Sequence, residues 1–222
     1  MSIALAQPMV NFSFANLGGD TVSYGSNVTA GNLLVFVYWG QGISGHPITG
    51  YSDISDTRGN TYSLAVISTP LSTGQCLAIW YCVTKTSGPN TITLTPSGQP
   101  PESEIVIYEF SGFPYGVYID GTPVSACANF TAPESIGPLT THSSAGDVVL
   151  GPIWFQGTSA GPGSGWTGAV TTDSNLEQYQ LTTGPGTYTS TSSPSDVWSG
   201  SVVAFAPLAP PTGLVAVATG GW

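Results

Sequence analysis

The sequence predicts an all-β protein, folded as a two-sheet antiparallel β-sandwich of the jelly-roll or Ig-like kind. Three observations lead to this class. Helical periodicity is nearly absent, and 29 Gly and 18 Pro residues interrupt the chain of 222 residues every few positions. Between them lie short runs rich in β-branched and aromatic residues, which are typical of strands. Turn signals recur about every 8–12 residues, as in sandwiches and barrels.

The strands are predicted from the apolar runs that these turn signals bound. The clearest runs, in chain order, are Asn32–Trp39, Thr61–Ser68, Cys76–Lys85, Thr91–Thr95, Glu104–Phe110, Asp147–Phe155 and Val197–Ala206. Weaker candidates are Ile3–Gln7, Asp20–Tyr24, Val117–Asp120, Gln178–Leu181 and Thr187–Thr191.

The run Cys76–Lys85 shows how such a strand is placed within a sheet. Successive side chains of a strand point to opposite faces. One face of this run carries Leu77, Ile79, Tyr81 and Val83, and the other carries Cys76, Ala78, Trp80 and Cys82. Because both faces are apolar, we expect a central strand that is covered on both sides. Glu104–Phe110 has the same character but contains the acid Glu109.

A weak internal sequence similarity suggests that the chain has two similar halves. Thr29–Trp39 and Ser144–Trp154 each have a turn closed by Ala-Gly, followed by an apolar strand that ends in Trp. Glu104–Gly112 similarly echoes Gly200–Leu208. The halves would span residues 20–112 and 135–208 and share one sandwich, since no linker divides them. We therefore predict one domain over residues 1–208, followed by a Pro-rich spacer and strand-like arm over 209–222.

Charge excludes several classes of partner. The chain has 2 basic and 12 acidic residues, a net charge of −10, and only 6% charged residues. Nucleic-acid binding needs several basic contacts to phosphates, and anionic membranes attract basic surfaces. Two cations, Arg58 and Lys85, cannot supply these contacts, and no apolar run is long enough to span a bilayer. Uncharged partners, either glycans or another protein surface, fit this composition better.

Export and redox state are constrained by the N-terminus and the cysteines. Met1–Gln7 lacks the basic start and apolar length of a signal peptide, so we expect export by another route, release by lysis, or a signal already removed. Cys76 and Cys82 lie about 20 Å apart along one predicted strand, beyond the reach of a disulfide. Only a pairing with Cys127 is feasible, and three buried small apolar side chains are the favoured interpretation.

Catalytic and metal motifs are weak. No serine-nucleophile elbow and no zinc-ligand spacing is present. Glu102 and Glu104 share a strand face, as a glycosidase pair could, although a solvated strand end is the simpler interpretation. Asp53, Asp56 and Asn60 offer oxygen ligands to calcium at short spacing. The same segment is typical of a hairpin turn at Gly59-Asn60, between Tyr51–Ser55 and Thr61–Ser68, and we favour the turn.

Aromatic residues are the most informative side chains for function. Trp39, Trp80 and Trp154 lie in predicted core strands and are expected to pack there. Trp166 and Trp198 lie in Gly- and Ser-rich surroundings, so we expect them to be exposed. Together with the loop residues Tyr179 and Tyr188, they are the candidate glycan-binding residues, because flat aromatic rings stack on sugars. The same side chains suit a protein interface.

A family resemblance adds to this picture. In order, Ser26–Trp39, Ser52–Tyr62, Gln75–Val83 and Glu104–Gly112 resemble a group of low-charge β-sandwich domains carried by bacteria and phages next to Ig-like or fibronectin type III modules. Pro-Pro-Thr-Gly-Leu followed by Val-Ala-Val, at 210–217, looks like the opening strand of a fibronectin type III domain. The resemblance implies an extracellular or virion-surface accessory role and supplies no active-site residues.

The function predicted first is a non-catalytic structural or adhesive subunit of an extracellular or virion-surface assembly. Its partners would be further copies or neighbouring structural proteins, with Leu214, Val215, Val217 and Trp222 in an assembly arm. A carbohydrate-binding module is the alternative, and a glycoside hydrolase ranks third. No cofactor is expected unless calcium binds.

Overall fold

The computed structural model describes residues 2–15, 20–41, 54–68, 75–95, 102–128, 134–155, 157, 161–192 and 198–211. In these residues the chain is all-β, every strand pairing is antiparallel, and no helix is present. No helix that could cross a membrane was found in the same ranges. The predicted fold class is therefore confirmed at the level of all-β with antiparallel sheets.

The first half of the chain forms two sheets. The five-stranded sheet has the order β1 (Ala4–Ala15), β8 (Glu102–Ser111), β3 (Leu33–Gln41), β6 (Gln75–Val83), β5 (Ser63–Ile67). The three-stranded sheet has the order β2 (Asp20–Ser23), β7 (Thr91–Leu94), β4 (Ile54–Asp56).

The second half forms two more sheets. The seven-stranded sheet follows the order β10 (Val124–Ala128), β17 (Trp198–Pro207), β12 (Val148–Leu150), β15 (Leu176–Leu181), β13 (Ile153–Phe155). In addition, β14 (Thr167–Val170) pairs with β15, and β9 (Val117–Ile119) pairs with β17. A two-stranded sheet joins β11 (Glu134–Thr140) to β16 (Thr187–Ser192).

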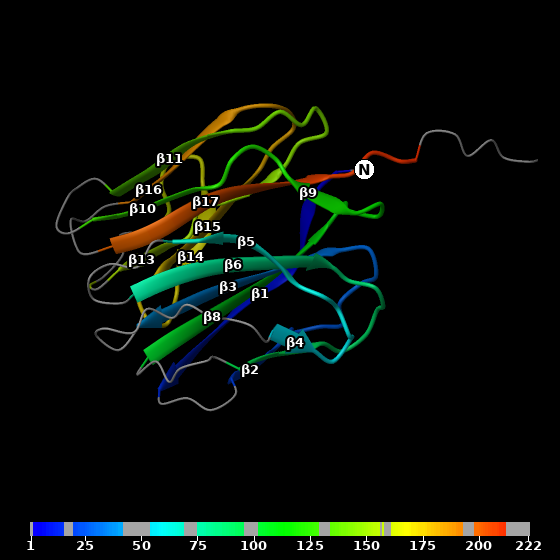
Figure 1. Cartoon of the computed structure of the whole chain (residues 1–222), viewed down its shortest axis with the longest axis horizontal. Coiled ribbons are helices and arrows are strands. Elements are labelled where there is room, and N and C mark those ends of the chain that lie inside the picture. Colours follow the sequence, from blue (N-terminus) through cyan, green and yellow to red (C-terminus); the bar gives the residue numbers. More distant parts are fainter. Residues whose placement is uncertain are drawn as a thin grey trace, which may run out of the picture.

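The four sheets stack as layers, with the five- and seven-stranded sheets in the middle (Figure 1). One apolar core packs the three-stranded sheet on the five-stranded sheet, and another packs the two-stranded sheet on the seven-stranded sheet. Between them lies the core that we call the seam, where the two large sheets face each other. Its fully buried members include Leu33, Val35, Tyr108, Phe110, Val148, Leu150, Val203 and Phe205.

Strand β6 confirms the prediction of a central strand covered on both faces. Leu77 and Ile79 are buried in the seam, and Tyr81 packs against it. Ala78 and Cys82 are buried in the opposite core, under the three-stranded sheet. This two-sided burial explains why the run has no polar face.

The two halves place equivalent strands in the same order. Strands β1-β8-β3-β6-β5 correspond in sheet order and in chain order to β10-β17-β12-β15-β14, with β13 continuing β12 beyond Gly151-Pro152. The turns before β3 and β12 also match, since Gly31 and Gly146 have φ values of 85° and 86°. An added Cβ at Gly146 would lie 2.1 Å from the Thr182 carbonyl oxygen, so this turn requires glycine. Strand β4 has no described counterpart in the second half.

The register corrects one detail of the sequence echo. Leu33 lies opposite Phe110, and its counterpart Val148 lies opposite Phe205, so Phe110 corresponds to Phe205. The sequence similarity pairs Glu104–Gly112 with Gly200–Leu208, which is shifted by one residue from the alignment that the register gives. A shift of one residue exchanges the two faces of a strand, and sequence similarity between two strands with apolar residues on both faces does not detect it.

Two aromatic contacts cross the seam in a reciprocal way. Tyr81 of β6 lies 4.9 Å from Phe205 of β17, centroid to centroid, and Tyr179 of β15 lies 5.5 Å from Phe110 of β8. Tyr81 and Tyr179 occupy corresponding positions, because they lie opposite Val35 and Leu150. The seam therefore repeats one contact in both directions, as an interface with two-fold symmetry does.

Other expectations differ from the structure. The described residues form four sheets, whereas two were predicted, since each half builds its own pair. The predicted hairpin between Tyr51–Ser55 and Thr61–Ser68 is wrong in its pairing, because β4 pairs with β7 and β5 pairs with β6. Strands β10, β11 and β14 were not predicted. The arm residues Leu214, Val215, Val217 and Trp222 lie outside the described residues.

Replacing a seam residue tests this packing. We expect Phe205→Ala to lower the free energy of unfolding by about 3–5 kcal/mol, because it removes a fully buried ring and leaves a cavity. Phe12→Ala, at a ring that is 51% exposed, is the control and should change stability by less than about 1 kcal/mol. Urea denaturation measures the free energy of unfolding of both variants. Equal losses of stability would contradict the packing of Phe205 in the seam.

Candidate functional site

The two tryptophans that we expected to be exposed for sugar binding are buried, so the expectation of exposure is wrong. Trp166 is 9% exposed and Trp198 is 4% exposed, and both belong to the core under the two-stranded sheet. The Trp166 Nε1 donates to the Thr189 carbonyl at 3.1 Å. An added Cβ at Gly151 would lie 2.7 Å from the Trp166 ring. Gly151, which is distant from Trp166 in the sequence, therefore makes room for the ring.

The two tyrosines chosen with them have separate positions. Tyr179 packs on the seam, with its ring against Tyr108 and Phe110, and burial raises the pKa of its hydroxyl. Tyr188 packs against the other core of the second half, beside Trp166 and Trp198. Since Tyr179 lies on the opposite side of the seven-stranded sheet, the four residues do not form one site.

The candidate calcium ligands form a hydrogen-bonded turn. Asp56 Oδ1 accepts from the backbone N–H groups of Arg58 and Asn60, at 3.1 and 2.9 Å. Its Oδ2 accepts from the Asn60 Nδ2, the Tyr62 hydroxyl and the Asn90 Nδ2. Burial opposes ionisation, but these bonds hold the pKa of Asp56 below its usual value. Asp53 lies outside the described residues, and within them no group of three His, Cys, Asp or Glu could hold a metal.

The cysteines also have defined states where their side chains are described. Cys82 and Cys127 are free thiols, Cys82 buried and Cys127 half-buried. Burial raises the pKa of Cys82 to about 12, so it stays a neutral apolar side chain. The side chain of Cys76 lies outside the described residues.

Buried carboxylates in both halves hold turns in place. Glu109 accepts from the backbone N–H of Thr29 at 2.8 Å, from the Asn32 Nδ2 at 2.7 Å, and from the Gln7 Nε2. It thereby ties strand β1 to the turn before β3. In the second half, Asp120 holds the turn before β12 by accepting hydrogen bonds from its backbone.

A second kind of buried carboxylate lies at the seam. Glu177 of β15 is fully buried and accepts from the Trp39 Nε1 at 3.0 Å and from the Tyr108 hydroxyl at 2.8 Å. Glu104 of β8 is 1% exposed and accepts from the Asn175 Nδ2 and the Thr171 hydroxyl, both at 2.8 Å. Both acids thus accept hydrogen bonds from the opposite half, and neither lines a described pocket.

The seam acids are shifted towards their neutral forms. Burial raises the pKa of Glu177 to about 8, and the nearby Glu104 adds to the rise, while the bonds from Tyr108 and Trp39 oppose it. Burial likewise raises the pKa of Glu104 against the bonds from Asn175, Thr171 and Asn11. With Glu177 protonated and Glu104 supplied with three donors, the pair needs no cation at the seam.

A pocket of about 540 Å³ opens at the end of the molecule where the β8–β9 connection, the β11–β12 turn and the segment after β17 meet. Three apolar side chains on its walls are strongly exposed, namely Tyr115 at 48%, Tyr118 at 39% and Leu208 at 44%. His142 and Ser144 contribute polar groups to the same walls. The pocket is therefore part apolar and part polar.

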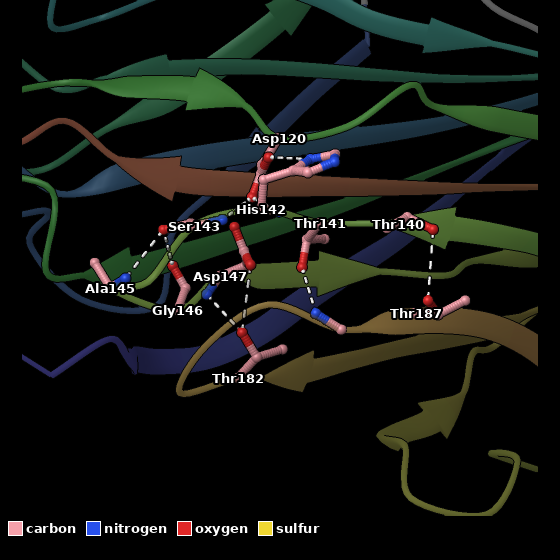
Figure 2. Close-up of polar contacts among 11 residues, drawn as sticks. Asp120, Thr140, Thr141, His142, Ser143, Ala145, Gly146, Asp147, Thr182 and Thr187 are labelled. Carbon is pink, nitrogen blue, oxygen red and sulfur yellow. Dashed lines mark hydrogen bonds and ion pairs between the residues drawn. The ribbon is translucent and has the colours of Figure 1, made fainter.

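One buried carboxylate fixes the polar wall of this pocket (Figure 2). Asp120 Oδ2 accepts from the backbone N–H groups of His142 and Ser143, at 2.7 and 2.6 Å. Its Oδ1 lies 3.4 Å from the His142 Nδ1, while the imidazole side chain is 74% exposed. Although burial opposes it, these bonds hold the pKa of Asp120 below its usual value. An ionised Asp120 orients the ring with Nδ1–H towards itself, leaving Nε2 as an acceptor.

Asp147, behind the same turn, completes the support. It is fully buried, its backbone N–H donates to the Thr182 hydroxyl at 2.7 Å, and burial and the Asp120 charge raise its pKa to about 6. Figure 2 shows Asp147 between the turn that Asp120 holds and Thr182, which follows strand β15. The wall is thus anchored to two neighbouring segments.

Sequence reasoning missed this pocket because its parts are distant in the chain. The pocket takes Tyr115 from the β8–β9 connection, Tyr118 from strand β9, His142 from the β11–β12 turn and Leu208 from the segment after β17. The one local signal was the placement of Tyr115 and Tyr118 near loops. Glu104 was identified as a candidate, but its partner Glu177 was not, since an isolated acid in a strand gives no indication of burial.

Comparisons with known proteins identify no relative, because no family model, no curated protein and no solved structure gives a match to this chain.

Glu177 gives the seam a pH dependence that can be measured. Its carboxyl keeps its proton in the folded protein up to a pKa of about 8, against an ordinary value of 4.5. The folded state therefore binds more protons between these values, and this contribution to stability is present at low pH and is lost as pH rises towards the folded pKa. We expect Glu177→Gln to match the wild type near pH 5 and to exceed it by roughly 4 kcal/mol near pH 9.

Thermal or urea denaturation of both proteins across this range checks the expectation. Gln keeps the acceptor for Trp39 and can donate to the Tyr108 oxygen, so the difference between the curves isolates the proton. A constant offset between the two proteins at all pH values would contradict a buried, protonated Glu177.

Proposed function

We propose that this protein is a non-catalytic structural subunit of an extracellular or virion-surface assembly, in which copies join through the edges of their central sheets. One observation carries the proposal. The strands that border the two large sheets, β1, β5, β9, β10 and β14, contain no Lys, Arg, Asp or Glu. Natural monomers protect such edges with charges, above all Lys, because an unpaired strand edge recruits another strand.

We further infer that each half is a jelly roll. In its eight-stranded form the chain runs so that strands 1, 8, 3 and 6 form one sheet and 2, 7 and 4 belong to the other. The first half has these orders, with β5 added to the larger sheet. The second half repeats the larger sheet as β10-β17-β12-β15 and keeps two strands of the smaller one, β11 and β16. Jelly rolls are common in viral capsid and lectin domains.

Strand β14 is the edge that best fits assembly. All four of its residues, Thr167–Val170, are exposed, and its pairing with β15 has no bulge. By contrast, the register of β1 shifts twice and that of β5 once, and such bulges hinder further pairing. A second copy could add its own β14 to this edge by backbone hydrogen bonds, which need no charged partner.

The acids support a structural role in preference to a hydrolytic one. Glu104, Glu109, Asp56 and Asp120 each accept three or more hydrogen bonds from the protein. A glycosidase needs two carboxyl groups that face a substrate across a cleft. The carboxylates described here instead fix turns and join the two halves.

Charging the β14 edge tests the proposal. We expect the wild type to form oligomers at about 100 µM and Val170→Lys to shift them to monomer by about tenfold or more, since a charge would be buried between strands. Leu181→Lys is a matched control, because both side chains are 41% exposed but Leu181 lies on β15, opposite Val148 of β12 and beyond the residues that pair with β14. Light scattering after size exclusion measures the mass.

A monomeric wild type at that concentration would contradict the proposal. Equal disruption by the two lysine variants would also contradict it, because the effect would then come from surface charge in general.

A further inference from the structure

The pocket beside Asp120 has a chemistry that assembly does not use. Of the eight large apolar side chains that are exposed among the described residues, three line this pocket: Tyr115, Tyr118 and Leu208. Most other aromatic rings that the structure describes lie in the cores. Two half-exposed tyrosines at one concave site provide flat apolar surface together with two hydroxyl groups, which is the usual make-up of a small-molecule site.

The walls select an uncharged ligand. No Lys, Arg, Asp or Glu lines the pocket. The two cations of the chain are engaged elsewhere, with the Arg58 Nη1 on the Ser87 carbonyl and the Lys85 Nζ on the Gly59 carbonyl. An anion would therefore find no counter-charge here and would approach a chain of net charge −10. A ligand with an apolar face and neutral polar edges suits these walls.

The polar groups are arranged for hydroxyl groups. The Asp120 Oδ1 lies 3.4 Å from the His142 Nδ1, and His142 lines the pocket. In the neutral imidazole that carries its proton on Nδ1, the Nε2 is an acceptor. The exposed Ser144 and the tyrosine hydroxyls can each donate and accept. Such groups match the alternating donors and acceptors around a sugar ring, whose C–H face stacks on an aromatic side chain.

The pocket is also preorganised, which lowers the entropic cost of binding. Asp120 fixes the turn that carries His142, and the Ala145 N–H donates to the Ser143 hydroxyl at 3.2 Å. On the other side, the Leu208 N–H donates to the Gly116 carbonyl at 3.1 Å and ties the segment after β17 to the tyrosine loop. Little ordering remains to be done when a ligand enters.

We propose that this pocket binds a neutral saccharide ring, with Tyr115 and Tyr118 as the apolar platform and His142 as a hydroxyl-binding residue. The site differs in position and in residues from the tryptophans that the sequence indicated. It goes beyond the assembly role and does not depend on it, because the pocket is complete within one chain.

Saturation-transfer NMR on the full chain tests the site with four neutral methyl glycosides, those of glucose, mannose, galactose and N-acetylglucosamine. We expect at least one to receive saturation, and its affinity to fall about tenfold or more in Tyr115→Ala, because the stacking surface is lost. His142→Ala should also weaken it. Phe12→Ala, another exposed aromatic outside the pocket, should leave the affinity unchanged.

The methyl glycoside of glucuronic acid is the matched ligand, since it differs from the glucoside by one carboxylate. We expect it not to bind. The proposal is overturned if none of the four neutral glycosides binds, if binding survives both Tyr115→Ala and His142→Ala, or if the glucuronoside binds as well as the neutral sugars.

Discussion

Burial of both faces of two adjacent sheets is the constraint on which this structure depends. The five- and seven-stranded sheets face each other at the seam, and each is covered on its outer side by a smaller sheet. Their central strands must therefore be apolar on both faces, as β3, β6, β12 and β17 are. The three apolar cores between the four described sheets remove many side chains from water, which suits a chain in which only 6% of the residues are charged.

The polar groups that do enter the interior have fixed tasks. Glu109 and Asp120 hold the turns that precede β3 and β12, one in each half. The seam departs from its reciprocal pattern at Glu177, where the corresponding position of the first half is Ile79. Burying an acid there is costly unless it is neutral or well bonded, and Glu177 meets both conditions through its raised pKa and its bonds to Trp39 and Tyr108. Such a group favours one alignment of the halves.

Strand patterns were predictable from the sequence, but the partners of the strands were not. The alternation within Cys76–Lys85 gave the correct two-sided burial, since that property belongs to one strand. The hairpin at Gly59-Asn60 was assigned wrongly because a turn dipeptide does not say whether its flanking strands enter the same sheet. Weak strands such as β14 lack an apolar face and are formed by pairing alone.

Site residues were less predictable because exposure depends on the whole fold. Gly-rich surroundings suggested exposure of Trp166, whereas its ring is buried against Gly151, which is distant in the sequence. The pocket beside Asp120 combines the β8–β9 connection, strand β9, the β11–β12 turn and the segment after β17, which are distant in the chain. The fold makes one further requirement, namely that the two halves are joined at the seam into a single unit.

Native-state hydrogen exchange tests that requirement most directly. If the seam joins the halves, the amides of the central strands β3, β6 and β8 and those of β12, β15 and β17 should exchange together, at the free energy of global unfolding. Edge strand β14 should exchange earlier, through local opening. Two distinct free energies, one for each half, would contradict the account, because each half would then unfold without the other.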